Sequence, residues 1–314
     1  MRLYNRHIVY TAAFLMDVVY PFALGAAAVY AVEMGASAIE LGYIGASGSF
    51  LYALSSIIGG KLCDRFSRKA IIIVNTVFAG VSCYLLFLST SVWQLCLYFG
   101  LFYGFLGFFW PPIQALIADS THRKDLITTL SNFCLSWSFG LSAGHLVCGY
   151  LTRSSAILPF FWGVVICAVI LVLTFSLSDS EGKARSGSED FLSRSDSPAR
   201  NAETWKRFIW CAWLSNFALV FVIGSIKMIF PKLALEVDHM DRSVLGILLA
   251  LIQIIDGLDR ALYHLPQGDE FSLHFSGRDL EYRLLRFIYE FVHIFRSVIT
   301  FGDYLRGRID KITE

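Results

Sequence analysis

Long apolar blocks are the feature that most constrains the fold of this chain. Residues 8–31, 70–90 and 156–177 are examples, and each is close to the roughly 20 residues that an α-helix needs to cross a bilayer. Hydrophobic residues make up 56% of the sequence and charged residues only 16%, whereas a soluble domain carries about 25% charged residues. The blocks therefore predict an all-α integral membrane protein.

The order of the blocks predicts the domain organisation. Six spans are expected in the N-terminal part, at residues 8–31, 41–62, 70–90, 92–117, 126–151 and 156–177. Residues 178–207 are rich in Ser, Gly and charge and cannot bury enough apolar surface to fold. We interpret the chain as a six-helix bundle (1–177), a flexible linker (178–207), the start of a second bundle (208–255) and a tail (256–314).

The second bundle is expected to contain one full span and one short span. The full span is predicted at residues 208–230 and is expected to end at Pro231. The short span begins at Val244 and meets Asp256 after about a dozen residues, fewer than a crossing needs.

Lys and Arg are sorted between alternate loops, and this bias sets the expected orientation. They gather before the first span, in the loops after the second and fourth spans, and in the linker, whereas the other loops hold almost none. The N-terminus and the linker are therefore expected to lie on the same, cytoplasmic side of the membrane. We expect this membrane to be the cell membrane. The net charge of +1 gives no indication of nucleic-acid binding.

The loop between the second and third spans reads "GGKLCDRFSRK" and follows the spacing G-x-x-x-D-R-x-G-R-[RK]. It resembles the corresponding cytoplasmic loop of the major facilitator superfamily of transporters, with Ser67 in place of the usual glycine. The segment "PPIQALIADSTHRKDLITTLSNF" resembles that family's fourth span, exit loop and fifth span. The resemblance covers about residues 5–250 and implies a secondary transporter with no cofactor, no metal and no catalytic residue.

In that family this loop latches the cytoplasmic mouth between two six-span halves. The resemblance implies this role for Gly60, Asp64, Arg65, Arg68 and Lys69, and a carboxylate at the end of the fourth span, Asp119, is placed to pair with the arginines. Gly59 and Gly60 are expected where the second span approaches a neighbour closely. The alternative is a basic loop that only fixes topology, but Asp64 serves no purpose in that reading.

Asp17 is the first candidate for the transport pathway, because ionisable residues inside a span are commonly functional. It lies near the middle of the first span and shares a helical face with Ala13, Pro21 and Gly25. This small-residue face predicts packing towards the protein. Asp17 is expected either to carry a proton or to form a structural hydrogen bond.

Other candidates line up on later spans. On the fifth span, Gly140 and Gly144 form a small-xxx-small pair followed by His145. Drug and proton antiporters of the family often have a proline at the position of His145, so the resemblance does not imply antiport for this chain. His145 is expected either to pack as a hydrogen-bonding residue or to relay protons. The remaining cavity candidates, from the fourth, fifth and seventh spans, are Trp110, Gln114, Asn132, Ser136 and Asn216.

Two further features complete the sequence-based interpretation. Pro111 and Pro112 are expected to free backbone carbonyls within the fourth span, and Lys227 is expected to extend to the outer membrane interface. In the tail, apolar residues recur at steps of four and three, which predicts an amphipathic helix. These residues are Leu280, Leu284, Phe287, Phe291, Ile294, Val298, Phe301 and Leu305.

The expected function is secondary transport of a small solute by alternating access, with proton coupling left open. The expected partners are membrane lipid, an unidentified small molecule and either a second copy or a complementary half. Two alternatives stand beside this function: a truncated or rearranged family member without transport of its own, and a membrane-embedded binding or scaffold protein. The absence of a G-x-x-x-x-G-K-[ST] loop argues against an ATP-driven pump.

Overall fold

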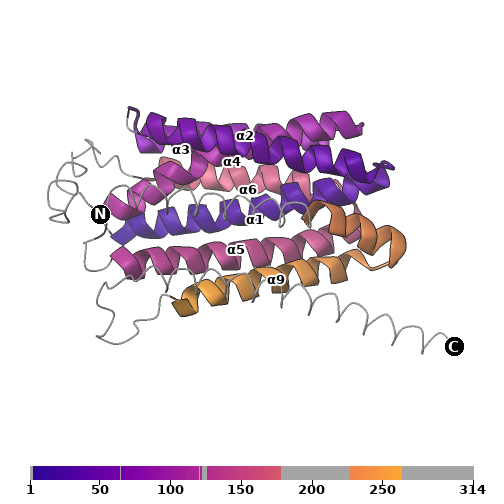
Figure 1. Cartoon of the computed structure of the whole chain (residues 1–314). Helices are drawn as coiled ribbons and strands as arrows, with labels where there is room; N and C mark the ends of the chain where they lie inside the picture. Colours follow the sequence, from indigo (N-terminus) through magenta and orange to yellow (C-terminus); the bar gives the residue numbers. More distant parts are fainter. Residues whose placement is uncertain (1–2, 64, 120, 122–125, 178–226, 264–314) are drawn as a thin grey trace, which may run out of the picture. The chain divides into compact units, whose positions relative to one another are not determined.

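A computed structural model describes residues 3–63, 65–119, 121, 126–177 and 227–263. Six long helices fill the N-terminal part: α1 (Leu3–Glu33), α2 (Ala38–Cys63), α3 (Arg68–Phe87), α4 (Val92–Asp119), α5 (Leu126–Ser154) and α6 (Leu158–Phe175). They run alongside one another as a bundle (Figure 1). The described residues contain no strand, so the predicted all-α class and six-helix bundle are confirmed.

The second part contributes a helix that ends in a π-helical turn, η2 (Leu233–Val237), and a further helix, α9 (Arg242–Tyr263). The helix before η2 continues through Pro231, so the predicted end of the seventh span at this proline is wrong. The Asp238 amide donates to the Leu233 carbonyl across 3.1 Å, an i to i+5 bond that accommodates one extra residue per turn. The predicted linker, Asn216 and the predicted tail helix lie outside the described residues.

Within the described residues, five helices are long and apolar enough to cross a membrane, namely α1, α2, α3, α4 and α6. The predicted fifth span forms α5, which is not among these five and carries many Ser, Thr and Gly residues. The apolar part of α9, Arg242–Ile255, is shorter than a crossing helix, as the sequence predicted. Its helical backbone nevertheless continues through Asp256 to Tyr263.

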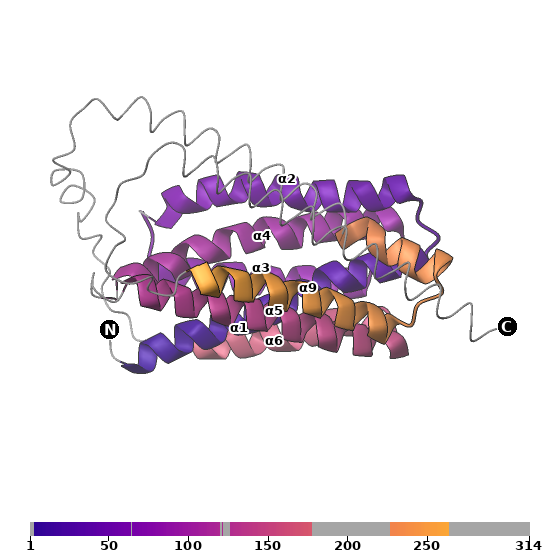
Figure 2. The same ribbon diagram turned by 60° about the horizontal axis from the view of Figure 1, so that its bottom comes forward.

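Helix α1 lies at the centre of the bundle. The most apolar window of α1 is 83% buried, against 22% for that of α2, because α1 packs on α4, α5 and α6 whereas α2 packs mainly on α4. Figure 2 shows α2 on the outside of α4. Since lipid tails are as apolar as leucine, close side-chain packing rather than exclusion of water holds these helices together.

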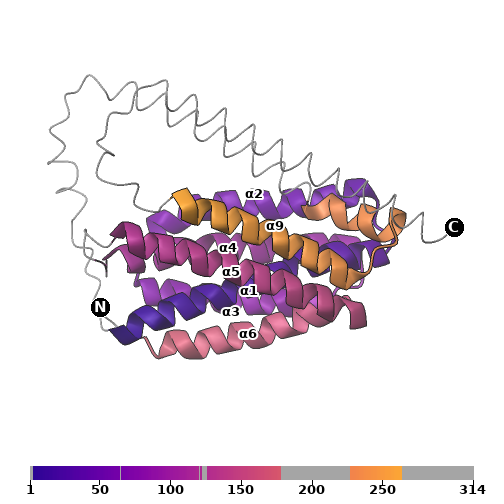
Figure 3. The same ribbon diagram turned by 90° about the horizontal axis from the view of Figure 1, so that it is seen from below.

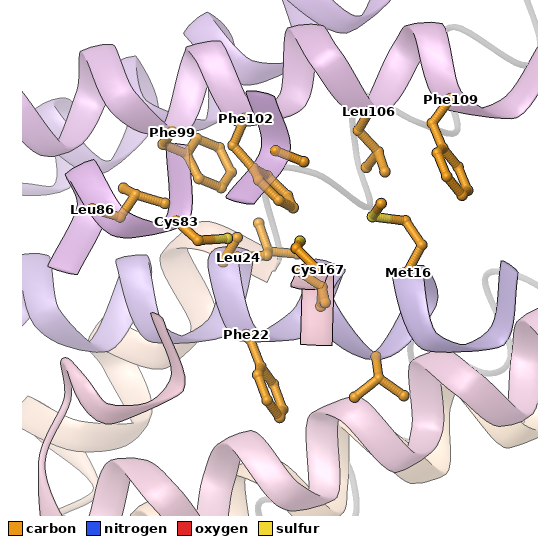
Figure 4. Packing of buried hydrophobic residues seen from close by; sticks show 14 of the residues in the cluster. Met16, Phe22, Leu24, Cys83, Leu86, Phe99, Phe102, Leu106, Phe109 and Cys167 are labelled. Carbon is orange, nitrogen blue, oxygen red and sulfur yellow. The ribbon is translucent and has the colours of Figure 1, made fainter. Parts of the chain in front are cut away.

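Figure 4 shows this packing around α1. Met16 and Phe22 leave α1 on opposite sides, and Met16 points towards Phe109 and Leu106 of α4. All four side chains are at most 2% exposed. Pro111 and Pro112 do not interrupt α4, which runs unbroken from Val92 to Asp119.

Local capping explains where two of the helices begin. The Glu40 carboxylate accepts the Ser37 amide at 2.8 Å, and the Ser37 hydroxyl accepts the Glu40 amide at 3.3 Å. This reciprocal pair is a capping box for α2. At α9, Asp241 Oδ1 accepts the Ser243 amide at 2.8 Å, and hydrogen bonds from Ser243 lower the pKa of Asp241.

Candidate functional site

Helix α5 lies between α1 and α9 and contacts both through glycines (Figure 3). A Cβ added to Gly140 would lie 2.8 Å from Asp17 Cβ, and one added to Gly144 would lie 2.8 Å from Pro21 Cγ. On the α9 side, a Cβ on Gly149 would lie 2.6 Å from Gly246 Cα. Real Cβ contacts are not this short, so only glycine permits α5 to approach both helices at these points.

Asp17 lies inside the bundle at the α1–α5 contact. Its side chain is 1% exposed, and Oδ2 is buried without a hydrogen-bond partner in the described part of the chain. A carboxylate in an apolar interior is costly unless it is paired, hydrogen-bonded or protonated. Asp17 is therefore a candidate for a functional role, because ionisable residues inside a span are commonly functional.

His145 is the second buried ionisable residue on this side of the bundle. It follows Gly144, which packs on Pro21, so it lies one turn of α1 from the level of Asp17. The ring is 2% exposed, and Nε2 has no hydrogen-bond partner among the described residues.

A cluster of tyrosines adjoins Asp17, and sequence reasoning did not identify it as a site. Tyr20 follows Asp17 by one turn on α1, and the Tyr103 hydroxyl of α4 donates to the Tyr20 hydroxyl. The two ring centroids are 5.3 Å apart, and Tyr52 of α2 lies edge-on to Tyr103 at 6.2 Å. We call Tyr20, Tyr52 and Tyr103 the tyrosine cluster. The sequence signal that could have found the cluster was the i, i+3 spacing of Asp17 and Tyr20, which places both on one face of a helix.

Lys227 joins this cluster from the second part of the chain. Its Nζ donates to Gln253 Oε1 of α9 at 3.3 Å and lies 5.9 Å from the centroid of the Tyr20 ring. The prediction that Lys227 extends to the outer interface is therefore wrong. Polar partners inside the protein hold the ammonium. The buried Gln253 amide (6% exposed) was not predicted as a site residue, because it lies within an apolar run.

The other sequence candidates within the described residues have different surroundings. The Trp110 ring packs on Phe109 and Phe133, with centroids at 5.2 and 6.3 Å, which makes it a packing residue between α4 and α5. Gln114 and Asn132 are exposed and Ser136 is half-buried. Their roles in a pathway remain predictions.

The loop expected to act as a latch is described only in part. Asp64 and the side chain of Asp119 lie outside the described residues, so their pairing remains a prediction. Lys69 Nζ donates to the Leu177 carbonyl at 2.5 Å, joining the start of α3 to the end of α6, and Arg65 is exposed.

Gly59 and Gly60, in the last turns of α2 before this loop, differ in their surroundings. A Cβ on Gly59 would lie 3.1 Å from Phe108 of α4, whereas a Cβ on Gly60 would meet no described atom within 4 Å. Close approach to a neighbouring helix therefore explains Gly59 and not Gly60.

The opposite end of the bundle carries an ion network that links the two parts of the chain. Arg242, at the start of α9, lies 2.5 Å from the Glu33 carboxylate of α1 and donates to the Thr152 carbonyl of α5 at 2.7 Å. Lys232 donates to the Ala36 carbonyl at 2.5 Å. We call Glu33, Thr152, Lys232 and Arg242 the Arg242 network.

We expect Arg242→Gln to loosen this end of the molecule, because it removes both the ion pair and the bond to Thr152. The measurement is labelling of Ala156→Cys, a position only 2% exposed, with a membrane-impermeant maleimide in a background without native cysteines. Labelling should rise several-fold. Arg153→Gln is the control, since its 3.7 Å pair with Asp241 is mostly exposed; equal labelling of both variants would contradict the role of Arg242.

Comparison with known proteins identifies the family. The family model of the Major Facilitator Superfamily matches residues 8–258. The chain belongs to this superfamily. It is therefore an integral membrane protein of a transporter family, as its resemblance in two loops and its apolar helices predicted.

Similar proteins of known sequence include resistance proteins. The class B tetracycline resistance protein of Escherichia coli is 31% identical over 130 residues, covering 40% of this chain and 31% of that protein. Multidrug resistance protein 1 of Bacillus subtilis is 30% identical over 122 residues, covering 38% and 31%. The class H tetracycline resistance protein of Pasteurella multocida is 24% identical and covers 65% and 54%. The chain thus matches between about a third and a half of the length of these relatives.

Solved structures share the fold at low sequence identity. The nucleoside transporter NupG aligns with a TM-score of 0.61 and 13% identity, covering 81% of this chain and 66% of that one. A bacterial homologue of the human lysosomal transporter Spinster, inward-facing and unoccupied, aligns with a TM-score of 0.58 and 16% identity, covering 82% and 61%. These likenesses show the fold and no more.

Proposed function

We propose that this superfamily member takes part in secondary active transport of a small organic solute by alternating access, driven by protons. The observation that supports this most is the meeting of polar side chains from both parts of the chain inside the bundle. Asp17 and Tyr20 come from the first part, and Lys227 and Gln253 from the second. Transporters of this architecture bind solutes near the membrane midplane, between their repeats.

The proton-coupling part of the proposal rests on Asp17 and His145. Both side chains are at most 2% exposed, and each has a buried polar atom without a partner in the described residues. An intramembrane carboxyl group that gains and loses a proton can link solute movement to a proton gradient. We assign this step to Asp17, because it lies beside the tyrosine cluster.

The proposed orientation places the N-terminus and the 178–207 linker in the cytoplasm of the cell. The support is the gathering of Lys and Arg in alternate loops. The Arg242 network then lies on the outer side of the membrane, where it holds that end closed around α1, α5 and α9.

The names of the related proteins supply a first solute to test. Two of the relatives are tetracycline resistance proteins, so we propose tetracycline as the initial transport probe. The 314-residue chain is reconstituted in proteoliposomes and a pH gradient is imposed. Tetracycline movement is followed by fluorescence, with empty liposomes as the control.

Proton transport is followed in the same vesicles with a trapped pH indicator. The proposal expects tetracycline movement and a matching proton flux, both of which stop when a protonophore collapses the gradient. Tetracycline movement unaffected by the protonophore would reject proton coupling. No movement of tetracycline or of any drug in a broader panel would reject transport by this chain.

A further inference from the structure

Two cysteines meet where α3 and α6 pack together, away from the transport site. Cys83 of α3 and Cys167 of α6 are both free cysteines, and a hydrogen bond joins their thiol groups. They are separated by more than eighty residues in the sequence, so only the fold brings them together. Neither thiol has a part in the proposed transport.

Two glycines set the close approach of the helices at this point. A Cβ added to Gly163 of α6 would lie 3.1 Å from Cys83 Sγ, and one added to Gly80 of α3 would lie 3.2 Å from Cys167 Cβ. Each cysteine therefore packs on the glycine that lies about one turn from the other cysteine. This closeness is what a disulfide requires, because its two Cβ atoms lie only about 3.5–4.5 Å apart.

The surroundings of the pair favour a covalent bond between the thiols over a bound metal ion. Both side chains are at most 1% exposed and lie in the packed interior drawn in Figure 4. Among the described residues, no group of three His, Cys, Asp or Glu side chains is placed to hold a metal ion. Two thiolates on a monovalent ion would also leave a net charge in this apolar interior, whereas a disulfide is neutral.

The position of the pair also indicates the class of oxidant. Tyr84 of α3 and Val169 of α6, one and two residues from the cysteines, are exposed on the outside of the bundle. The thiols are thus separated from the surface by the width of a helix rather than by the whole bundle. A small, neutral oxidant suits such a position, because a charged one would lose its hydration on entering.

We propose that Cys83 and Cys167 form a reversible disulfide when the protein meets hydrogen peroxide. The thiolate of one cysteine attacks a peroxide oxygen and the O–O bond breaks, which gives a sulfenic acid and one water. The second sulfur then attacks the sulfenic sulfur, the S–O bond breaks, and a second water leaves as the S–S bond forms. The two sulfurs are oxidised, the two peroxide oxygens are reduced, and both thiol protons end in the water released.

The test treats the 314-residue chain in lipid nanodiscs with hydrogen peroxide. Remaining thiols are blocked with N-ethylmaleimide in denaturant, and linked peptides are identified by mass spectrometry after digestion without reductant. We expect one dominant link, between the peptides that contain Cys83 and Cys167, and two fewer free thiols per chain. Dithiothreitol added after denaturation should restore both thiols, since it reduces a disulfide but not a sulfinic acid.

Variants assign the reversible loss of thiols to this pair. Cys83→Ser and Cys167→Ser should each abolish it, because a sulfenic acid at the remaining cysteine then has no second thiol beside it. Cys148→Ser is the matched control and should keep the link: Cys148 is also buried, but its hydrogen bond is to the backbone of Ala26. The link is read directly in the wild type, so the result does not depend on how well the variants fold.

Three results would overturn the inference. They are an unchanged number of thiols in the treated wild type, a dominant link between any other two cysteines, or the same reversible loss of thiols in Cys83→Ser. None of these measurements requires a gradient or a solute, so the disulfide and the proposed transport stand or fall separately.

Discussion

Asp17→Asn should abolish proton-driven solute transport while leaving the protein folded. The two side chains are nearly the same in shape, but an amide cannot accept and release the proton that a carboxyl group exchanges. Asp17 is fully buried, and its Oδ2 has no partner in the described residues, so no hydrogen bond of that oxygen is lost in the variant. We expect a reduction of about 100-fold or more in gradient-driven transport, equivalent to about 2.7 kcal/mol.

The measurement is uptake in proteoliposomes under an imposed pH gradient, beside solute exchange without a gradient. Exchange should persist in Asp17→Asn, because it requires binding and movement but no net proton transfer. Asp238→Asn, in the exposed turn before α9, is the control and should behave as the wild type. Gradient-driven uptake at the wild-type rate in Asp17→Asn would show that the carboxyl group has only a structural role.

Gly149→Ala should detach α9 from α5, the second large expected effect. A methyl group at this position would lie 2.6 Å from Gly246 Cα and 2.8 Å from the Arg242 carbonyl. Both neighbours are backbone atoms, which cannot rotate away as a side chain can. We expect the free energy of unfolding to fall by about 1–3 kcal/mol, the usual cost of overpacking, and to fall further in Gly149→Val.

Gly42→Ala on α2 is the matched control, since no described atom lies within 4 Å of its added Cβ. In an exposed helix, alanine is more favourable than glycine by about 1 kcal/mol. The control substitution should therefore be neutral or slightly stabilising. The measurement is the thermal midpoint of the detergent-solubilised protein, followed by size-exclusion chromatography. Equal thermal midpoints for the two variants would contradict the prediction, because they would show that α5 and α9 can move apart to accommodate the added methyl group.

The sequence predicted the secondary structure well because membrane spans impose a strong local constraint. Every backbone group must be bonded within the helix, and the length must match the bilayer. The predicted span of residues 41–62 and the observed α2 (Ala38–Cys63) therefore differ by only a few residues. The prediction failed at Pro231, because the helix continues through this proline into the π-helical turn Leu233–Val237.

The candidate site was predicted only in part. Asp17 and His145 stood out because ionisable residues are rare within apolar spans. Lys227 was misplaced because a lysine near the end of a span commonly extends to the interface. Gln253 and the tyrosine cluster were missed because they lie within apolar runs, where residue type alone did not single them out.

The sequence by itself determined that this chain crosses a membrane, where its helices lie and which family it resembles. Those properties follow from residue type and spacing along one chain. Only the tertiary structure decided which side chains meet inside the bundle. These are Tyr20 of α1, Tyr103 of α4, Gln253 of α9, and Lys227 from the helix before η2. Their meeting depends on which helix faces approach, and glycines such as Gly140 and Gly149 set that approach by permitting backbone contact.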